Sequence, residues 1–595
     1  MSGSLYVAHG DVSQLSADVL VYSTDQSGQP GHLYRAFCLH VPGFEVAYKE
    51  ACQREGLSGG RWLLPGETFW VLLPFDKQSA VRAPQGVVVV GVIGRDESWG
   101  ALNQKIVKAS VETAAQYLQG SPRGGRWLVA IPALGMGAAL AGRQNSGAAR
   151  RARADAARAQ VAAARKALTA QDDLDIAFVA YTPDIYHLYE RARHETQNQG
   201  PGEEMAIPTP LAQAIRDGEC VLFIGSGLSS GAGLSGWQAL VEKMATEMGL
   251  PKAEQGSTDY FLDVAQLYRH QDGGRERLAA LIRAEFGGKW AKPTLAHYLL
   301  MGLGVRHVIT TNYDGLLERT LTALRRDPIK VVTEANVART GETGAHFVVK
   351  FHGDAEQPDD GIVLSRADYE DFFHDRPAMT ALLEGLLLNQ TFLFVGYSLS
   401  DPNFRQIYGR VARILKASKR MAYAVEFNAG ASELTRAAWK DRRLELIDVP
   451  GAGSEQSHHL LRFLNGLAAA VSDEPKLFMG EQTDLRDALA ALGEKVSSAA
   501  SRDNLGTEEV RVLASSLTFL TRHGWRPSVQ HSAWETWRRL AEQCRKDPNR
   551  KLMMLREALK HTESLKDAET VREELQDAEA EAEKARAELG SGTLS

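Results

Sequence analysis

The chain has 595 residues, of which 44% are apolar and 24% charged, and its formal net charge is -6 at pH 7. This length exceeds what one hydrophobic core supports, so we expect three or four structural units. The composition is that of a globular protein, and the negative net charge argues against an extended nucleic-acid-binding surface.

The four cysteines are far apart in the chain, and none forms a CxxC pair. This spacing excludes an obvious zinc ribbon or disulfide framework and is typical of a protein in the reducing cytoplasm. The first residues, "MSGSLYVAHGDVSQ", lack the basic and apolar regions of a secretory signal. No apolar run reaches about 18 residues, so we expect no membrane span and a cytoplasmic location.

Residues 1–194 alternate short apolar runs with helical patterns. The runs "DVLVYS", "GVVVVGVIG", "RWLVAIPAL" and "LDIAFVAYT" are typical of buried strands, and residues 101–118 and 147–168 have helical patterns. This alternation predicts an α/β domain with a largely parallel sheet. The polar segment 195–210 contains proline and glycine without periodicity, which predicts an interdomain linker.

Residues 211–473 repeat the alternation. The runs "CVLFIG", "HVITTN", "HFVVKFHG", "TFLFVGYS" and "MAYAVEF" again predict strands, here of a second, Rossmann-type parallel sheet. From 474 to 595 the strand pattern disappears, and helical spacing at 482–497 and 551–561 predicts a helical region. This region is either an oligomerisation or docking module or a helical cap on the preceding domain.

The stretch "GSGLSSGAGLSGW" follows the strand expected at 220–224, and we expect a helix to begin near Trp237. Backbone N–H groups and a helix N-terminus in such a place bind phosphates. The spacing is GxGxxxG rather than the dinucleotide pattern GxGxxG, and no GK[ST] follows. Taken alone, the stretch is equally consistent with a phosphate site and with a plain strand-to-helix turn.

Polar residues follow three further strands of this region. Asn312 and Asp314 lie in "TTNYD", His352 lies in "KFHGD", and Ser398 and Asp401 lie in "FVGYSLSDPNF". Parallel sheets present their binding sites at the carboxyl ends of strands. Each residue alone has a structural explanation, but four such strand ends in one domain indicate a site.

With these motifs, residues 207–470 resemble the sirtuin-like domain of bacterial anti-phage effectors. The resemblance implies an NAD+-binding domain with Asn312 and His352 as catalytic residues. It places further residues at the dinucleotide: Gly225, Ser226, Gly227, Ser229, Thr311, Asp314, Gly396, Ser398 and Asp401.

The four-cysteine zinc module of sirtuin deacylases has no counterpart here, so we expect no metal and favour NAD+ hydrolysis over deacylation. A histidine such as His352 can act as a general base, and the amide of Asn312 can position a water molecule or ribose hydroxyl. A protein deacylase or ADP-ribosyltransferase remains one alternative. A non-enzymatic NAD+ or ADP-ribose sensor is the other.

The first zone resembles a macro domain through "VAHGDVSQLSADVLVYSTD" and "RWLVAIPALGMGAALAG". Macro domains bind ADP-ribose or related nucleotides, and the resemblance places Asp11 at the adenine. The expected phosphate-facing residues are Gly28, Gly31, Gly135, Met136, Gly137 and Ala138. The family's "NAAN" is replaced by residues 22–25, "YSTD", which argues for ligand sensing over hydrolysis and leaves a degenerate scaffold as the alternative.

A chain that combines these two domains resembles Thoeris-like defence effectors, in which a nucleotide-sensing domain controls a sirtuin-like NADase. This similarity implies a homo-oligomeric enzyme that depletes cellular NAD+ when an ADP-ribose-like or cyclic nucleotide signal binds the first domain. Binding of the reaction product there is an open alternative. We expect neither nucleic acid nor a membrane as partner.

Overall fold

The computed structural model describes most of the chain. The residues outside the described part are 1–2, 25–32, 58–62, 75–83, 93–98, 121, 123–124, 137–146, 172, 197–204, 251–257, 289–290, 342–344, 359–360, 398–404, 406–407, 410–419, 427–432, 452, 473–495, 501–509, 511–512, 515, 518–532, 545–547, 561–564 and 592–595. Two compact units are present: Met1–Gln144 with Asp155–Val471, and Asn145–Ala154 with Ser472–Ser595. The division of the first unit into a macro-like and a sirtuin-like domain, joined by a linker at 195–210, stays a prediction.

The first sheet of the larger unit has six strands in the order β1-β6-β5-β2-β4-β3. Its pairs are parallel except for the antiparallel pair β3 and β4. The strands are β1 (Leu5–His9), β2 (Val19–Thr24), β3 (Thr68–Leu72), β4 (Gly86–Gly91), β5 (Trp127–Pro132) and β6 (Leu174–Ala180). The helices of this region are η1 (Val12–Gln14), α1 (Tyr34–His40), α2 (Phe44–Arg54), α3 (Trp99–Tyr117), α4 (Gly147–Ala170) and α5 (Pro183–Glu195).

The second sheet has seven parallel strands in the order β13-β12-β11-β7-β8-β10-β9. The strands are β7 (Cys220–Ile224), β8 (His307–Thr310), β9 (Pro328–Val331), β10 (His346–Lys350), β11 (Thr391–Val395), β12 (Ala422–Glu426) and β13 (Leu444–Asp448). Leu222 and Val221, neighbours on β7, belong to different core clusters. This alternation shows that both faces of the sheet are covered, as is usual for parallel sheets.

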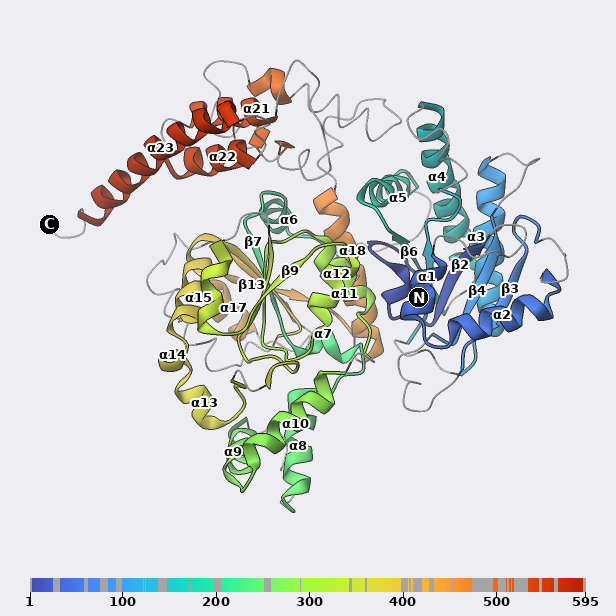
Figure 1. Cartoon of the computed structure of the whole chain (residues 1–595), viewed down its shortest axis with the longest axis horizontal. Coiled ribbons are helices and arrows are strands. Elements are labelled where there is room, and N and C mark those ends of the chain that lie inside the picture. Colours follow the sequence, from blue (N-terminus) through green and yellow to red (C-terminus); the bar gives the residue numbers. More distant parts are fainter. Residues whose placement is uncertain are drawn as a thin grey trace. The chain divides into compact units, whose positions relative to one another are not determined.

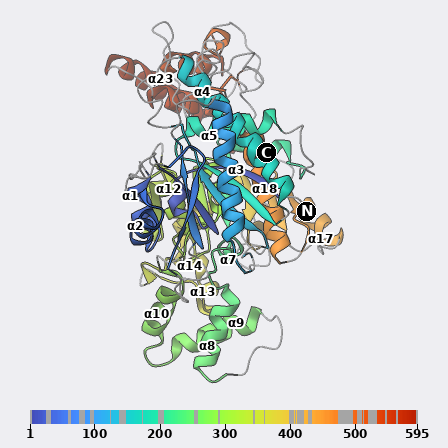
Figure 2. The ribbon, with the colours of Figure 1, turned by 90° about the vertical axis from the view of Figure 1, so that its right-hand side faces the viewer.

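Helices surround this second sheet. They are α6 (Thr209–Arg216), α7 (Ser226–Ser230), α8 (Trp237–Glu247), α9 (Thr258–His270), α10 (Gly274–Phe286), α11 (Leu295–Gly302), α12 (Leu316–Ala323), η5 (Glu334–Gly341), α13 (Arg366–Glu370), α14 (Phe372–Asp375), α15 (Pro377–Asn389), α17 (Glu433–Asp441) and α18 (Ser454–Ser472). Helices α8, α9 and α10 gather beyond the sheet on the same side as α7 and α13 (Figures 1 and 2). They enclose a small core of their own, which includes Leu240, Phe261 and Ile282.

The smaller unit is helical, as predicted. Its longer helices are α21 (Ala533–Gln543), α22 (Pro548–Lys560) and α23 (Leu565–Ser591). Trp537, Leu555 and Val571 are buried in one cluster, so the highly charged α23 contributes an apolar face to a core. Among the described helices of the whole chain, none has the length and apolarity needed to cross a membrane. The α/β class of the first two zones and the helical character of the last are confirmed.

Candidate active site

Four neighbouring strands of the second sheet end at the same level. The pairing registers place Val395, Ile224, Thr310 and Lys350 side by side on β11, β7, β8 and β10. Because these strands are parallel, the residues that follow them meet at one edge of the sheet. The edge therefore brings together Gly225, Asn312, His352 and Gly396.

Two glycine-containing turns pack closely at this edge. The N–H of Gly225 donates to the carbonyl of Val395, and the N–H of Gly227 donates to the carbonyl of Gly396, both at 3.0 Å. A Cβ atom on Gly225 would lie 2.2 Å from the carbonyl oxygen of Gly396. Gly396 has a φ of 65°, and its Cβ would lie 2.5 Å from the nitrogen of Leu228. Glycine is therefore required for this close approach, and contact of these glycines with a dinucleotide stays a prediction.

The glycine-rich stretch contains a short helix that the sequence does not predict. Residues Ser226–Ser230 form α7, while α8 begins at Trp237 as expected. Ser226 is exposed on α7, and Ser229 is buried. Several of its N–H groups donate to backbone carbonyls, among them those of Gly227, Leu228 and Ala232, so hydrogen bonds fix the conformation of the stretch.

Asn312 is buried, and its hydrogen bonds are made by its nitrogen atoms and not by its side-chain oxygen. Its Nδ2 donates to the carbonyl of Gly225 at 3.2 Å and to Oγ of Ser229 at 3.0 Å, and its backbone N–H donates to Oγ1 of Thr310 at 3.0 Å. Its Oδ1 has no hydrogen-bond partner among the described residues. A buried carbonyl oxygen without a donor is costly. This oxygen is therefore ready to accept a hydrogen bond from a hydroxyl group or water molecule.

His352 is 8% exposed and lies against an aromatic wall. Its ring centroid is 5.5 Å from that of Tyr369 and 6.4 Å from that of Phe372, both in edge-on contacts. The carbonyl of His352 accepts the N–H of Val363 at 3.1 Å. The ring orientation is thus limited by packing, which suits a side chain that must present one nitrogen to a reactant.

A buried charge cluster lies directly beneath the edge. Nζ of the fully buried Lys350 donates to the carbonyls of Tyr313 at 3.0 Å and Asp314 at 2.6 Å. It also lies 3.3 Å from Glu318 Oε1 and 3.6 Å from Asp354 Oδ1. The sequence analysis assigned no role to Lys350. The signal was present, because a lysine interrupts the apolar run "HFVVKFHG" of an interior strand.

Asp314 stabilises the turn after β8 rather than facing outward. It is buried, and its Oδ1 accepts the N–H of Leu316 at 3.0 Å. Its charge acts on the buried His297, at the start of α11. Nδ1 of His297 accepts the N–H of Thr294 at 3.2 Å, which completes a capping interaction of that helix.

Acid is expected to destabilise the protein through His297. Burial, only partly opposed by the charge of Asp314, lowers the pKa of His297 to about 4. Between that value and the ordinary value near 6.5, the unfolded chain binds a proton that the native chain does not, so stability falls as the pH drops. As the pH is lowered, we expect the free energy of unfolding to decrease more steeply in the wild type than in His297→Gln. The difference should approach about 1.4 kcal/mol per pH unit between pH 6.5 and 4.5.

Chemical denaturation at several pH values measures these slopes. The matched control is His374→Gln, because the side chain of His374 is 92% exposed. Equal slopes in the wild type and His297→Gln would contradict the assignment.

Of the predicted macro-like residues, the structure describes three. Asp11 is buried, and its carboxylate accepts hydrogen bonds from Ser13 N at 3.0 Å and Gln14 Nε2 at 3.0 Å. Gly135, with a φ of 67°, and the buried Met136 follow β5. Their contact with a nucleotide stays a prediction. The other predicted positions, Gly28, Gly31, Gly137 and Ala138, lie outside the described residues, as do Ser398 and Asp401 of the second site.

Thr311 lies between the paired strand end and Asn312 and is partly exposed. The structure thus brings together all of the described residues predicted for the second site. Within the described part of the chain, no three His, Cys, Asp or Glu side chains are grouped so that they could hold a metal ion.

Comparison with known families agrees with this geometry. Residues 306–447 match the family model described as a SIR2-like domain. The match begins just before β8 and includes Asn312 and His352, together with the strands from β8 to β12.

Curated relatives match a part of the chain. The NAD(+) hydrolase ThsA of Enterococcus faecium is 31% identical over 216 residues, which are 36% of this chain and 44% of that protein. ThsA of Acinetobacter baumannii is 32% identical over 224 residues, or 38% and 45% of the two chains. Defense-associated sirtuin 2 of Bacillus subtilis is 24% identical over 283 residues, or 47% and 28%. The chain thus spans less than half of the length of these relatives.

Among solved structures, the macrodomain of Oceanobacillus iheyensis with ADP is 15% identical. The similarity covers 33% of this chain and 94% of that one, with a TM-score of 0.26.

Proposed function

We propose that the chain is an NAD+ hydrolase that releases nicotinamide, with Asn312 and His352 as its catalytic residues. The observation that carries the proposal is the unpaired, buried Oδ1 of Asn312 at the sheet edge that also presents His352. The named activity of the ThsA relatives supports the choice of NAD+ as substrate. No resident metal is part of the proposed mechanism.

The proposed reaction is a substitution at the anomeric carbon of the nicotinamide ribose. The oxygen of a water molecule forms a bond to this carbon, and the bond to the nicotinamide nitrogen breaks. Its electron pair stays with nicotinamide, which leaves as a neutral molecule. His352 accepts the proton of the water as general base. Asn312 Oδ1 accepts a hydrogen bond from the water or a ribose hydroxyl and so fixes the reacting geometry.

A nicotinamide-release assay on the purified chain tests the proposal. Release of nicotinamide with equal formation of ADP-ribose or its cyclic form is the expected result. Release that requires an acyl-peptide, or transfer of label to protein, would indicate a deacylase or ADP-ribosyltransferase instead. Tight binding of NAD+ without any release would indicate a sensor.

We further propose that the first sheet region senses a nucleotide and regulates this activity. Support comes from hydrogen bonds between the Asp11 loop and the second sheet region. The hydroxyl of Tyr298 donates to the carbonyl of Asp11 at 2.7 Å, and Nζ of Lys292 donates to the carbonyl of Ser13 at 3.0 Å. Burial, partly opposed by Asp11, lowers the pKa of Lys292 to about 8. The loop proposed to bind adenine is therefore attached to α11.

Helix α11 also reaches the glycine-rich stretch. All residues from Leu295 to Met301 are buried, so this helix is enclosed by the fold rather than lying on its surface. Thr294, its N-cap, is near Gly231, where an added Cβ would lie 3.6 Å from Thr294 Cγ2. A short series of contacts thus joins Asp11 to the end of α7 through Tyr298 and Thr294. A signal changes activity only if it binds the active arrangement better than the inactive one.

Removing one hydroxyl group is expected to weaken this coupling. We expect ADP-ribose to change the rate of nicotinamide release in the wild type. Tyr298→Phe should reduce the ratio of the rates with and without ADP-ribose by about fivefold, the effect of one hydrogen bond of about 1 kcal/mol. Tyr117→Phe is the control, since Tyr117 is 43% exposed and its ring stacks on that of Trp70. An unchanged ratio in Tyr298→Phe would contradict coupling through this contact.

The proposed biological role is anti-phage defence by depletion of cytoplasmic NAD+. The name of the Bacillus subtilis relative, a defence-associated sirtuin, supports it. Assembly into a homo-oligomer is part of the proposal and is tested by light scattering of the active protein.

A further inference from the structure

A cavity of about 700 Å³ lies at the end of β9, next to the predicted active site. Its walls come from α9 and α10, from the residues after β9, from Pro358 and from the segment 361–376. Two wall residues also contact His352: Val363 through the backbone hydrogen bond and Phe372 through its ring. A cavity of this volume suits a small organic ligand.

The carboxylates that line the cavity already have partners or face solvent. Asp368 pairs with Arg269 and accepts the N–H of Ser365 at 2.9 Å. Glu334 accepts two backbone N–H groups at the start of α15, at 2.6 and 3.0 Å. The side chain of Asp375 is 66% exposed and lies 3.1 Å from the ring of His374. Arg269 therefore compensates the charge of Asp368, and two backbone N–H groups stabilise that of Glu334.

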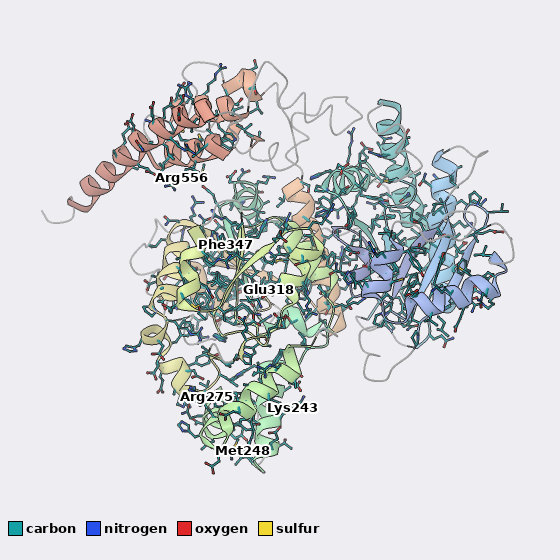
Figure 3. The ribbon with its side chains drawn as sticks, in the orientation of Figure 1. Lys243, Met248, Arg275, Glu318, Phe347 and Arg556 are labelled. Atoms are coloured by element: carbon teal, nitrogen blue, oxygen red, sulfur yellow. The ribbon has the colours of Figure 1, made fainter. Side chains whose placement is uncertain are left out.

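Unlike Arg269, two of the lining guanidinium groups form no ion pair with a described residue. Arg376 donates to the carbonyls of Phe351 at 3.1 Å and Gly361 at 2.6 Å, and it has no ion pair with any described residue. Arg275, in the first turn of α10 (Figure 3), makes neither a hydrogen bond nor an ion pair within the described part of the chain. The lining groups carry three positive and three negative charges, and the two guanidinium groups without ion pairs present N–H donors beside apolar side chains such as Leu278 and Ile362.

We propose that this cavity binds a small phosphate ester, with its phosphate on Arg275 and Arg376 and its organic part against the apolar wall. Guanidinium groups match phosphate oxygens with paired, charge-assisted hydrogen bonds. The site is separate from the glycine-rich edge, because no residue of the stretch 225–237 lines the cavity. One consequence rests on the proposed function: a ligand here adjoins the wall of His352 and lowers the rate of nicotinamide release.

Calorimetric titration of the full chain with ribose 5-phosphate tests the site directly. We expect saturable binding that Arg275→Ala weakens about tenfold or more, through loss of a charge-assisted hydrogen bond. Arg275 is exposed, so this variant should fold normally. The matched control is Arg277→Ala on the same helix, because Arg277 lies over the ring of Tyr268 and does not line the cavity.

Two further probes distinguish the sources of the anion. Equal affinity for inorganic phosphate would support the site and show that it recognises the phosphate alone. Tighter binding of ribose 5-phosphate would support recognition of the sugar as well. Binding that Arg275→Ala leaves unchanged, or a preference for the carboxylate nicotinate, would overturn the proposal.

The binding test requires no turnover, so its result is independent of the enzyme assay. A chain that binds ribose 5-phosphate through Arg275 but releases no nicotinamide would refute the proposed function and support the anion site. A chain that releases nicotinamide but binds no phosphate ester would refute the anion site alone. Ribose 5-phosphate should also lower nicotinamide release in the wild type and do so less in Arg275→Ala.

Discussion

Replacing His352 or Asn312 by alanine is expected to lower kcat for nicotinamide release from NAD+ by about 100-fold or more. A positioned acid–base group increases the rate of a reaction by a factor of about 10²–10⁴. The change His352→Ala removes the proposed proton acceptor, and Asn312→Ala removes the unpaired oxygen that orients the reactant. Rates of nicotinamide release at saturating NAD+ measure both effects.

Matched controls separate this loss from general damage. His374→Ala removes a histidine whose side chain is 92% exposed. Asn389→Ala removes an exposed asparagine whose side chain donates to the carbonyl of Gly385 in its own helix. Both controls should keep the wild-type rate. Wild-type turnover in both catalytic variants would refute the assignment of the site.

Asn312 also holds the glycine-rich stretch, so its loss has a structural part. Ser229→Ala measures that part, because it removes one of the two acceptors of Asn312 Nδ2 and leaves Oδ1 in place. We expect Ser229→Ala to lower kcat much less than Asn312→Ala. Equal losses would show that Asn312 acts by supporting the turn.

The interior strands could be predicted because burial on both faces requires continuous apolar runs. "CVLFIG" and "TFLFVGYS" correspond to β7 and β11, which are fully buried. β9 and β13 were not predicted. Both lie at the edges of the second sheet, and their sequences "PIKV" and "LELID" mix apolar with charged residues. Edge strands need less apolar surface, so their pattern is weaker.

The helix α7 was not predicted for a different reason. Glycine and serine are poor helix formers, and "SGLSS" has no local preference for a helix. The turn that precedes it is fixed by close contact with Gly396, which is about 170 residues away in sequence. Such a contact follows from the fold and not from local sequence.

The candidate site was predictable in part. Asn312 and His352 were found because polar residues at the ends of apolar strands are conspicuous. The contacts of Tyr298 and Lys292 with the Asp11 loop were not, because no sequence pattern shows which surfaces of two regions meet. The buried charge cluster was also missed, since a charged residue in a sequence is exposed far more often than buried.

That cluster is expected to be essential for stability. Lys350 and Asp354 are fully buried, and the side chain of Glu318 is 12% exposed. Burial alone would raise the pKa of Asp354, but Lys350 and Lys330 outweigh it and hold the pKa below its ordinary value. Asp354 is therefore a carboxylate at neutral pH. Lys350 lies within ion-pair distance of both Asp354 and Glu318, and Lys330 is a second partner of Asp354.

We expect Lys350→Met to lower the free energy of unfolding by about 3–5 kcal/mol, the effect of removing one charge from a buried ion-pair cluster. Methionine keeps much of the volume, so the loss reports charge rather than a cavity. Lys350→Met combined with Asp354→Asn should recover part of the loss, because the double variant buries one negative charge fewer. Chemical denaturation measures these differences, with Lys440→Met on exposed α17 as the control.

Since Lys350 also holds the carbonyls of Tyr313 and Asp314, just after Asn312, the single variant should lose kcat as well. A Lys350→Met protein with wild-type stability and turnover would show that the two carboxylates are neutralised in another way.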